Sequence, residues 1–150
     1  MNAADQFHTG IVVDDLDAAL TEFSALFGYE WCPKLEISTP VVLPDGETTL
    51  DLVFTYSTAA PRVEMIQSIP GTLWTPVPAS GIHHLGYWSD DVAADAAALT
   101  DQGFAAEATG IRPDGEPVWA YHRNPNGPRI ELVSRDMAEG LAQYWASGPA

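Results

Sequence analysis

The sequence predicts an α+β protein made of two tandem βαβββ modules, and an internal repeat is the main reason. Residues 8–16 and 84–92 share the pattern H-x-G-x-x-x-D-D-[LV]. Residues 61–66 and 128–133 share the pattern P-R-[VI]-E-[ML]-[IV], and the two pairs occur in the same order along the chain. Two matches in register indicate a duplicated unit of about 70 residues.

The first module covers about residues 6–68 and begins with a strand over 7–13, where β-branched residues are frequent. Asp14 or Asp15 can cap the helix that follows, because a side-chain oxygen there accepts a free backbone N–H. Apolar residues then recur every three to four positions until Gly28, a residue that favours a helix end. Alternating and apolar runs predict three further strands, over residues 31–42, 48–56 and 62–66.

A proline-rich linker over about residues 69–81 precedes the second module, which covers about 82–134. Its elements repeat the order of the first module: a strand over 84–89, a helix over 91–102 that ends at Gly103, and strands over 104–109, 117–123 and 129–134. A last helix over about 136–146 follows. At 150 residues, the chain is expected to form a single domain.

Composition and charge exclude several classes of function. The chain has six Lys and Arg residues but 21 Asp and Glu residues. The resulting net charge of −15 repels nucleic acid and anionic membranes. No apolar run approaches the roughly 20 residues that span a bilayer, and the first residues do not resemble a signal peptide. The one cysteine, Cys32, excludes an intrachain disulfide and a cysteine-based zinc site. We therefore expect a cytoplasmic protein that acts on a small molecule.

The repeat places one histidine and one glutamate at the same position of each module: His8 with Glu64, and His84 with Glu131. Imidazole and carboxylate together suit zinc, nickel, cobalt, manganese or ferrous iron. A single buried histidine is normally a core residue, and a single strand glutamate normally faces solvent. Four such residues at matching places in two repeats predict a metal site instead.

Each of these histidines shares a strand face with a glycine two residues later, Gly10 or Gly86, because side chains alternate between the faces of a strand. A glycine beside the histidine leaves room on that face. A surface strand would not need that room, so the pattern indicates an enclosed polar cavity.

Two motifs of the second module are specific enough to suggest a family. They are Gly81-Ile82-His83-His84-Leu85 and the segment from Asn124 to Glu131. With His8 and its Asp-Asp-Leu helix start, they resemble the vicinal oxygen chelate superfamily over about residues 6–134. This superfamily includes glyoxalase I, methylmalonyl-CoA epimerase, extradiol dioxygenases and bleomycin-resistance proteins. The resemblance implies that the two modules curl into a half-open barrel around a metal, and that the protein is a homodimer.

Carried over residue by residue, the resemblance makes His8, Glu64, His84 and Glu131 the ligands of one divalent metal ion. Nickel, cobalt, zinc and manganese are expected ahead of iron. The repeat register selects His84 over His83, which then points to the opposite face as a packing or hydrogen-bonding residue. The His-Glu-His-Glu set is similar to bacterial glyoxalase I, whereas the Gly-Ile-His-His-Leu motif is more similar to the epimerases.

This family resemblance implies proton transfer next to a carbonyl through a metal-stabilised enolate, as an epimerase, isomerase or glyoxalase-type lyase. We expect Glu131 to be the mobile ligand and base, with Glu64 as its counterpart. Glu47 is a further candidate base, although it could simply be a turn residue after Asp45 and Gly46.

Two alternatives stay open. The first is an Fe(II)-dependent dioxygenase with a facial triad of His8, His84 and Glu131. Glu64 would crowd the oxygen site of such an enzyme. Tyr121 or His122 would then supply the acid–base chemistry. The second is a non-catalytic protein that binds a small molecule such as an antibiotic in an aromatic pocket.

Because the chain has so few cations, the substrate is expected to be compact and partly aromatic or neutral, with a thioester left open as an alternative. The candidate substrate-binding residues are Phe54, Trp74, Trp88, Trp119, Tyr121 and Arg123. Arg62 and Arg129 share strand faces with Glu64 and Glu131, so they could bind an anion or pair with those carboxylates.

Overall fold

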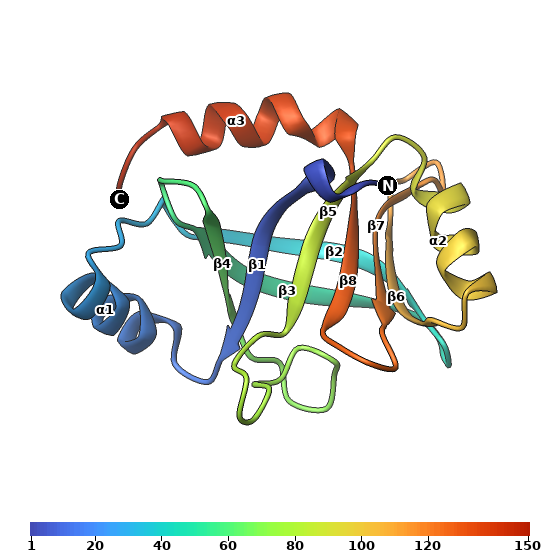
Figure 1. Cartoon of the computed structure of the whole chain (residues 1–150), viewed down its shortest axis with the longest axis horizontal. Coiled ribbons are helices and arrows are strands. Elements are labelled where there is room, and N and C mark those ends of the chain that lie inside the picture. The colour runs from blue at the N-terminus through green and yellow to red at the C-terminus, as the bar shows by residue number, and fades with distance from the viewer.

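The computed structural model describes all residues 1–150 and has the α+β fold predicted by the repeat (Figure 1). The first half contains β1 (Gln6–Val13), α1 (Leu16–Phe27), β2 (Leu35–Leu43), β3 (Gly46–Tyr56) and β4 (Arg62–Gln67). The second half repeats this order with β5 (His84–Ser89), α2 (Val92–Asp101), β6 (Ala105–Ile111), β7 (Pro117–Arg123) and β8 (Arg129–Ser134).

The eight strands form one ring of backbone pairing in the order β1-β4-β3-β2-β6-β7-β8-β5. The pairs β1–β4 and β5–β8 are parallel, and every other neighbouring pair is antiparallel. The junction between β2 and β6 consists of only Val41 opposite Gly110 and Val42 opposite Thr109. The barrel expected to be half-open is therefore closed, and this short junction is what closes it.

Aspartates start both long helices, as the sequence predicts. The side chain of Asp15 accepts a hydrogen bond from the backbone N–H of Ala18 at the start of α1. The side chain of Asp91 accepts one from the N–H of Ala94 at the start of α2. Gly28 ends α1 in the left-handed region, with φ of 72°, which costs glycine little. The two helices lie outside the barrel at opposite sides (Figure 1).

Several element boundaries differ from the sequence prediction by one or more residues. The strand expected over 31–42 begins only at Leu35, because Pro33 has no N–H to pair and Trp31 forms just an isolated bridge with Ser57. The strand β3 begins two residues earlier than expected, at Gly46. The last helix starts with a 3₁₀ turn over 135–137, and α3 follows over Ala138–Ala146.

The core has an inner part and two outer parts. Apolar residues of all eight strands meet inside the barrel, while α1 and α2 pack outside it. Met65 and Leu132 are fully buried and face these helices, so the residues beside them, Glu64 and Glu131, point into the barrel. None of the helices has the length and apolar character needed to cross a membrane.

Candidate metal centre

The two histidines lie on neighbouring antiparallel strands in a reciprocal arrangement. His8 on β1 pairs with Gly86 on β5, and His84 on β5 pairs with Gly10 on β1. A Cβ atom added to Gly10 would collide with the His84 ring, and one added to Gly86 would collide with the His8 ring. Each glycine therefore makes the space that the histidine of the other module occupies.

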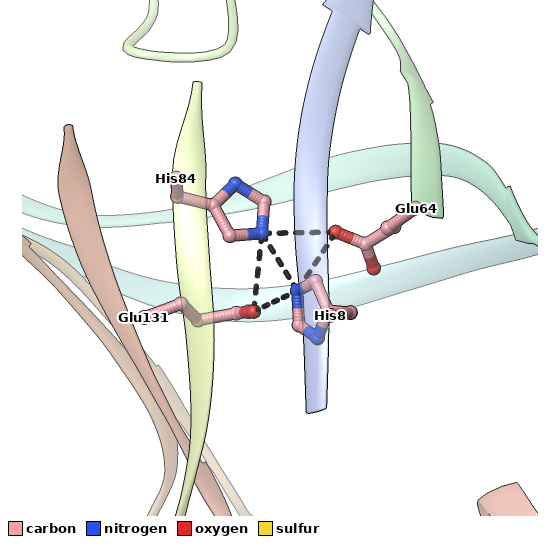
Figure 2. A group of neighbouring side chains, drawn as sticks. All are labelled: His8, Glu64, His84 and Glu131. Carbon is pink, nitrogen blue, oxygen red and sulfur yellow. Dashed lines mark hydrogen bonds and ion pairs between the residues drawn. The ribbon is translucent and has the colours of Figure 1, made fainter. Parts of the chain in front are cut away.

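The two glutamates enter from the strands that flank this pair. The parallel partners place Glu64 beside Gly10 and Glu131 beside Gly86. One nitrogen or oxygen atom from each of the four residues lies within 4.8 Å of the other three, and all four residues are buried (Figure 2). The structure thus brings together, within one chain, the four residues that the sequence predicts as metal ligands.

The distances within this cluster are short. The Nε2 atoms of His8 and His84 are 2.8 Å apart. The Oε2 atom of Glu131 lies 3.0 Å from Nε2 of His8, and Oε2 of Glu64 lies 3.1 Å from Nε2 of His84. Neither of these two buried carboxylate oxygens has a hydrogen-bond partner. Carboxylate oxygens and imidazole nitrogens that converge at a buried point are the donor set of a divalent cation.

The protonation states of His84 and Glu131 depend on each other. Burial alone would lower the pKa of His84, but the carboxylates of Glu131 and Glu64 outweigh it and raise this pKa to about 9. Burial alone would raise the pKa of Glu131, but the adjacent His84 and His8 hold that pKa well below its usual range. A proton on Nε2 of His84 therefore occupies the position that a cation would take.

His83 orients the ring of His84. Its Nε2 lies 2.9 Å from the carbonyl oxygen of Leu73, which can only accept a hydrogen bond, so this nitrogen carries a proton. Burial lowers the pKa of His83 to about 3, so the ring is neutral and its Nδ1 accepts from Nδ1–H of His84 at 3.0 Å. This hydrogen bond leaves Nε2 of His84 as the atom that faces the cluster. His8 has no such partner, and its Nδ1 is buried without a hydrogen bond.

Two tyrosines stand at matching places beside the glutamates. Tyr56 on β3 is paired with Glu64, and Tyr121 on β7 with Glu131. Burial and the nearby carboxylates raise the pKa of both tyrosines well above the ordinary value, so both stay neutral. Sequence reasoning named Tyr121 but missed Tyr56, although the duplication places a tyrosine at the end of the third strand of the first module.

A cavity of about 250 Å³ adjoins the cluster, with Glu64 and Glu131 in its wall. Of its 16 lining residues, 13 are hydrophobic. Four of the expected substrate-binding residues line it: Phe54, Trp74, Trp119 and Tyr121. Sequence reasoning missed the aliphatic part of the wall, which comes from β2, β3, β4, β7, β8 and the C-terminal segment: Leu35, Ile37, Leu52, Ile66, Val118, Val133, Met137 and Leu141.

Two other expected substrate contacts lie outside this cavity. Trp88 stacks on Phe7, with ring centroids 3.8 Å apart and planes 11° from parallel. A change of register at Phe7, between Gln6 and His8, accompanies this stacking. Arg123 is 58% exposed and forms an ion pair with Glu107 at the end of β7. Neither residue is among those that line the cavity.

Glu47 and His122 also lie apart from the cluster. Glu47 is exposed in the hairpin between β2 and β3, nine residues from Tyr56, which is about 30 Å along an extended strand. His122 shares a strand face with Ala120, which packs against α2 outside the barrel. The acid–base role considered for His122 in a dioxygenase therefore has no support from its position.

The two arginines expected near the carboxylates have other partners. Arg129 forms an ion pair with Glu107, with Nε 2.5 Å from the carboxylate oxygen. Arg62 donates to the carbonyl oxygens of Ser57 and Thr58, each at 2.8 Å. Neither arginine pairs with Glu64 or Glu131, so of the two possibilities that the sequence left open, pairing with those carboxylates is not the one formed.

The barrel and its buried pairs of histidine and glutamate define a class: a duplicated βαβββ protein with one candidate metal centre. Residues 7–118 match the family model of the glyoxalase/bleomycin resistance protein/dioxygenase superfamily, and the chain belongs to this family. It is 28% identical over 133 residues to the uncharacterized protein YwbC of Bacillus subtilis (strain 168), covering 85% of this chain and 95% of that protein.

Solved structures with the same fold include methylmalonyl-CoA epimerases. A complex of such an epimerase with methylmalonyl-CoA and NH4+ superposes with a TM-score of 0.57 at 18% identity, over 87% of this chain and 93% of that one. The epimerase from Mycobacterium tuberculosis gives a TM-score of 0.54 at 19% identity, over 89% and 92%. At these identities the likeness establishes the shared fold.

Proposed function

We propose that the protein is a divalent-metal-dependent enzyme that moves a proton next to a substrate carbonyl. The observation that carries this proposal is the buried cluster of His8, Glu64, His84 and Glu131, whose two carboxylates also line the cavity. These four residues would hold one metal ion, with nickel, cobalt, zinc and manganese ahead of iron. When bound, the ion supplies a Lewis acid that stabilises negative charge on a substrate oxygen.

The two glutamates provide the proton chemistry. In this proposal a carboxylate oxygen of Glu131 accepts the proton from the carbon next to the carbonyl, while the C–H electron pair moves toward the carbonyl oxygen. Glu64 approaches from the other module and, when it enters the reaction protonated, can give its proton to the opposite side, after which Glu131 passes its own proton to solvent. Return to the same carbon gives an epimerase, and return to the neighbouring carbon gives an isomerase or a glyoxalase-type reaction.

The surroundings of the glutamates support this assignment. No lysine, arginine or histidine outside the cluster lines the cavity. Tyr56 and Tyr121 remain neutral, and Glu47 is distant. The carboxylates of Glu131 and Glu64 are therefore the bases that a bound substrate can reach. Their side chains retain 9% and 6% exposure, consistent with access from the cavity.

The dioxygenase alternative is less well supported by the same geometry. A facial triad needs open positions opposite two histidines and one carboxylate. Here Oε2 of Glu64 lies 3.1 Å from His84 and 3.6 Å from His8, so it completes a four-residue set. The homodimer implied by the family stays a prediction, and because one chain supplies all four donors, the metal centre does not depend on it.

The proposal is tested by proton exchange in D₂O. Metal-loaded protein is incubated with a panel of α-hydroxyketones, thioesters and hemithioacetals, and loss of the α-proton signal is followed by NMR. We expect exchange that requires the metal and is lost in Glu131→Gln. Absence of exchange across the panel in fully loaded protein, together with tight binding of a panel member, would favour the small-molecule binding protein instead.

A further inference from the structure

We infer that the cavity selects a compact, uncharged, largely apolar carbonyl compound, of the size of an aryl ketone, rather than an acyl-CoA. The inference rests on the proposed function only where it places the carbonyl beside Glu64 and Glu131. The size and lining of the cavity carry the rest. A volume of about 250 Å³ falls below the roughly 300–1,000 Å³ usual for ligand pockets, so the part of the occupant that lies inside the cavity is small.

The wall of the cavity offers almost nothing polar except the two carboxylates. Thr39 and the two tyrosines are the other lining residues with hydroxyl groups. The indole rings of Trp74 and Trp119 lie edge to face, with centroids 6.0 Å apart, and present flat apolar surface. An aromatic or branched aliphatic group gains free energy by leaving water for such a wall, at about 25 cal/mol per Å² of buried apolar area.

The cations of the chain are all engaged elsewhere. None of the six lysine and arginine side chains lines the cavity. The guanidinium of Arg62 donates hydrogen bonds to two backbone carbonyls, and its Cζ lies 4.1 Å from the centroid of the Trp145 ring. The other five form ion pairs with carboxylates: Lys34 with Asp17, Arg112 with Asp136, Arg123 and Arg129 with Glu107, and Arg135 with Asp5 and Asp90.

Charge balance then decides between substrate classes. The phosphates of an acyl-CoA bring several negative charges toward a chain with a net charge of −15 and no free cation at the cavity. Within the cluster, the two negative charges of Glu64 and Glu131 would balance a bound divalent cation, so no net positive charge would remain to attract an anion. A neutral ketone with a second oxygen next to its carbonyl is not repelled by the net negative charge of the chain. It also needs no cation at the cavity.

The C-terminal segment forms part of the cavity wall. Met137 and Leu141 line the cavity, and α3 extends over one end of the barrel (Figure 1). Tyr144 fixes this helix, because its hydroxyl donates to the carbonyl oxygen of Pro33 at 2.6 Å. A larger side chain at Leu141 should therefore reduce the cavity without disturbing the strands.

The test compares two probes by isothermal titration calorimetry: α-hydroxyacetophenone, a neutral aryl ketone, and propionyl-CoA. Each is titrated into the protein as purified and after removal of metal with EDTA. We expect the aryl ketone to bind the purified protein at least tenfold more tightly than propionyl-CoA. We expect Leu141→Trp to weaken the aryl ketone at least tenfold, while Leu26→Trp, on the exposed face of α1, leaves it unchanged.

The outcomes separate this inference from the proposed function. Equal or tighter binding of propionyl-CoA, or failure of both probes to bind, would overturn the inference. Selective binding of the aryl ketone without exchange of its α-proton would leave the inference standing and count against the enzyme. Proton exchange confined to CoA thioesters would support the enzyme and overturn the inference.

Discussion

The imidazole ring of His8 occupies the space that a Cβ atom on Gly86 would need. The relationship is reciprocal, because His84 fills the corresponding space at Gly10. Two histidines on adjacent strands can therefore bring their Nε2 atoms to 2.8 Å in a closed barrel. The duplicated pattern of histidine and glycine is thus a steric requirement of the cluster.

Gly86→Ala is expected to remove the metal centre. The added methyl group displaces the His8 ring, and such overpacking costs about 1–3 kcal/mol of stability. Metal content by mass spectrometry should fall from about one equivalent to a small fraction, with the fold retained by circular dichroism. Gly140→Ala is the control: it lies on α3 with open space around it, and it should keep the metal. Full metal content in Gly86→Ala would contradict the steric argument.

His83→Phe tests the orientation of His84. Phenylalanine is the residue at the matching position of the first module, Phe7, so the exchange imitates a neighbour that cannot hydrogen-bond. Loss of an outer partner of a metal-binding histidine typically weakens metal affinity about 10–100-fold. Chelator competition should show this loss in His83→Phe and a much smaller change in His122→Phe, a buried histidine away from the cluster. Equal effects would reduce His83 to a packing residue.

Glu131→Gln tests the base assignment. Glutamine keeps the shape of the side chain but cannot accept the proton, and general-base catalysis contributes about 10²–10⁴-fold to rate. We expect exchange of the substrate α-proton to fall by at least 10²-fold, whereas Glu47→Gln leaves it unchanged. The base assignment is wrong if Glu131→Gln retains both turnover and metal affinity.

Metal affinity is expected to rise with pH. The pKa of His84 is about 9 without metal, so below this pH a cation must displace a proton from Nε2. Apparent affinity should increase by up to about tenfold per pH unit between pH 6.5 and 8.5 and level off above about 9. Calorimetry in buffers of different ionisation enthalpy should detect about one proton released per metal near neutral pH. Affinity independent of pH, with no proton release, would show that His84 is already deprotonated.

Sequence predicted the module order and brought His8, Glu64, His84 and Glu131 into one hypothesis because the duplication preserved their spacing. The alternation of side chains along the strands also predicted that Gly10 and Gly86 leave room beside the histidines. These features depend on local pattern and on internal repetition, and both can be recognised in a single sequence.

What sequence missed depends on contacts between distant strands. Trp88 has the parity of a cavity residue, yet stacking on Phe7 at the irregular end of β1 keeps it out of the wall. Arg123 and Arg129 both meet Glu107 on β6, a partner that no local pattern indicates. The contribution of Leu141 follows from how α3 crosses the barrel, which side-chain periodicity does not specify.

Elemental analysis of the purified, tag-free protein, beside His84→Ala, tests the central claim most directly. The account predicts about one equivalent of nickel, cobalt, zinc or manganese in the natural chain and a large loss in the variant. Iron in its place would move the dioxygenase to first place. No metal in the natural chain, and none retained after incubation with these ions and dialysis, would contradict the account. The four residues would then be a family feature that no longer binds metal.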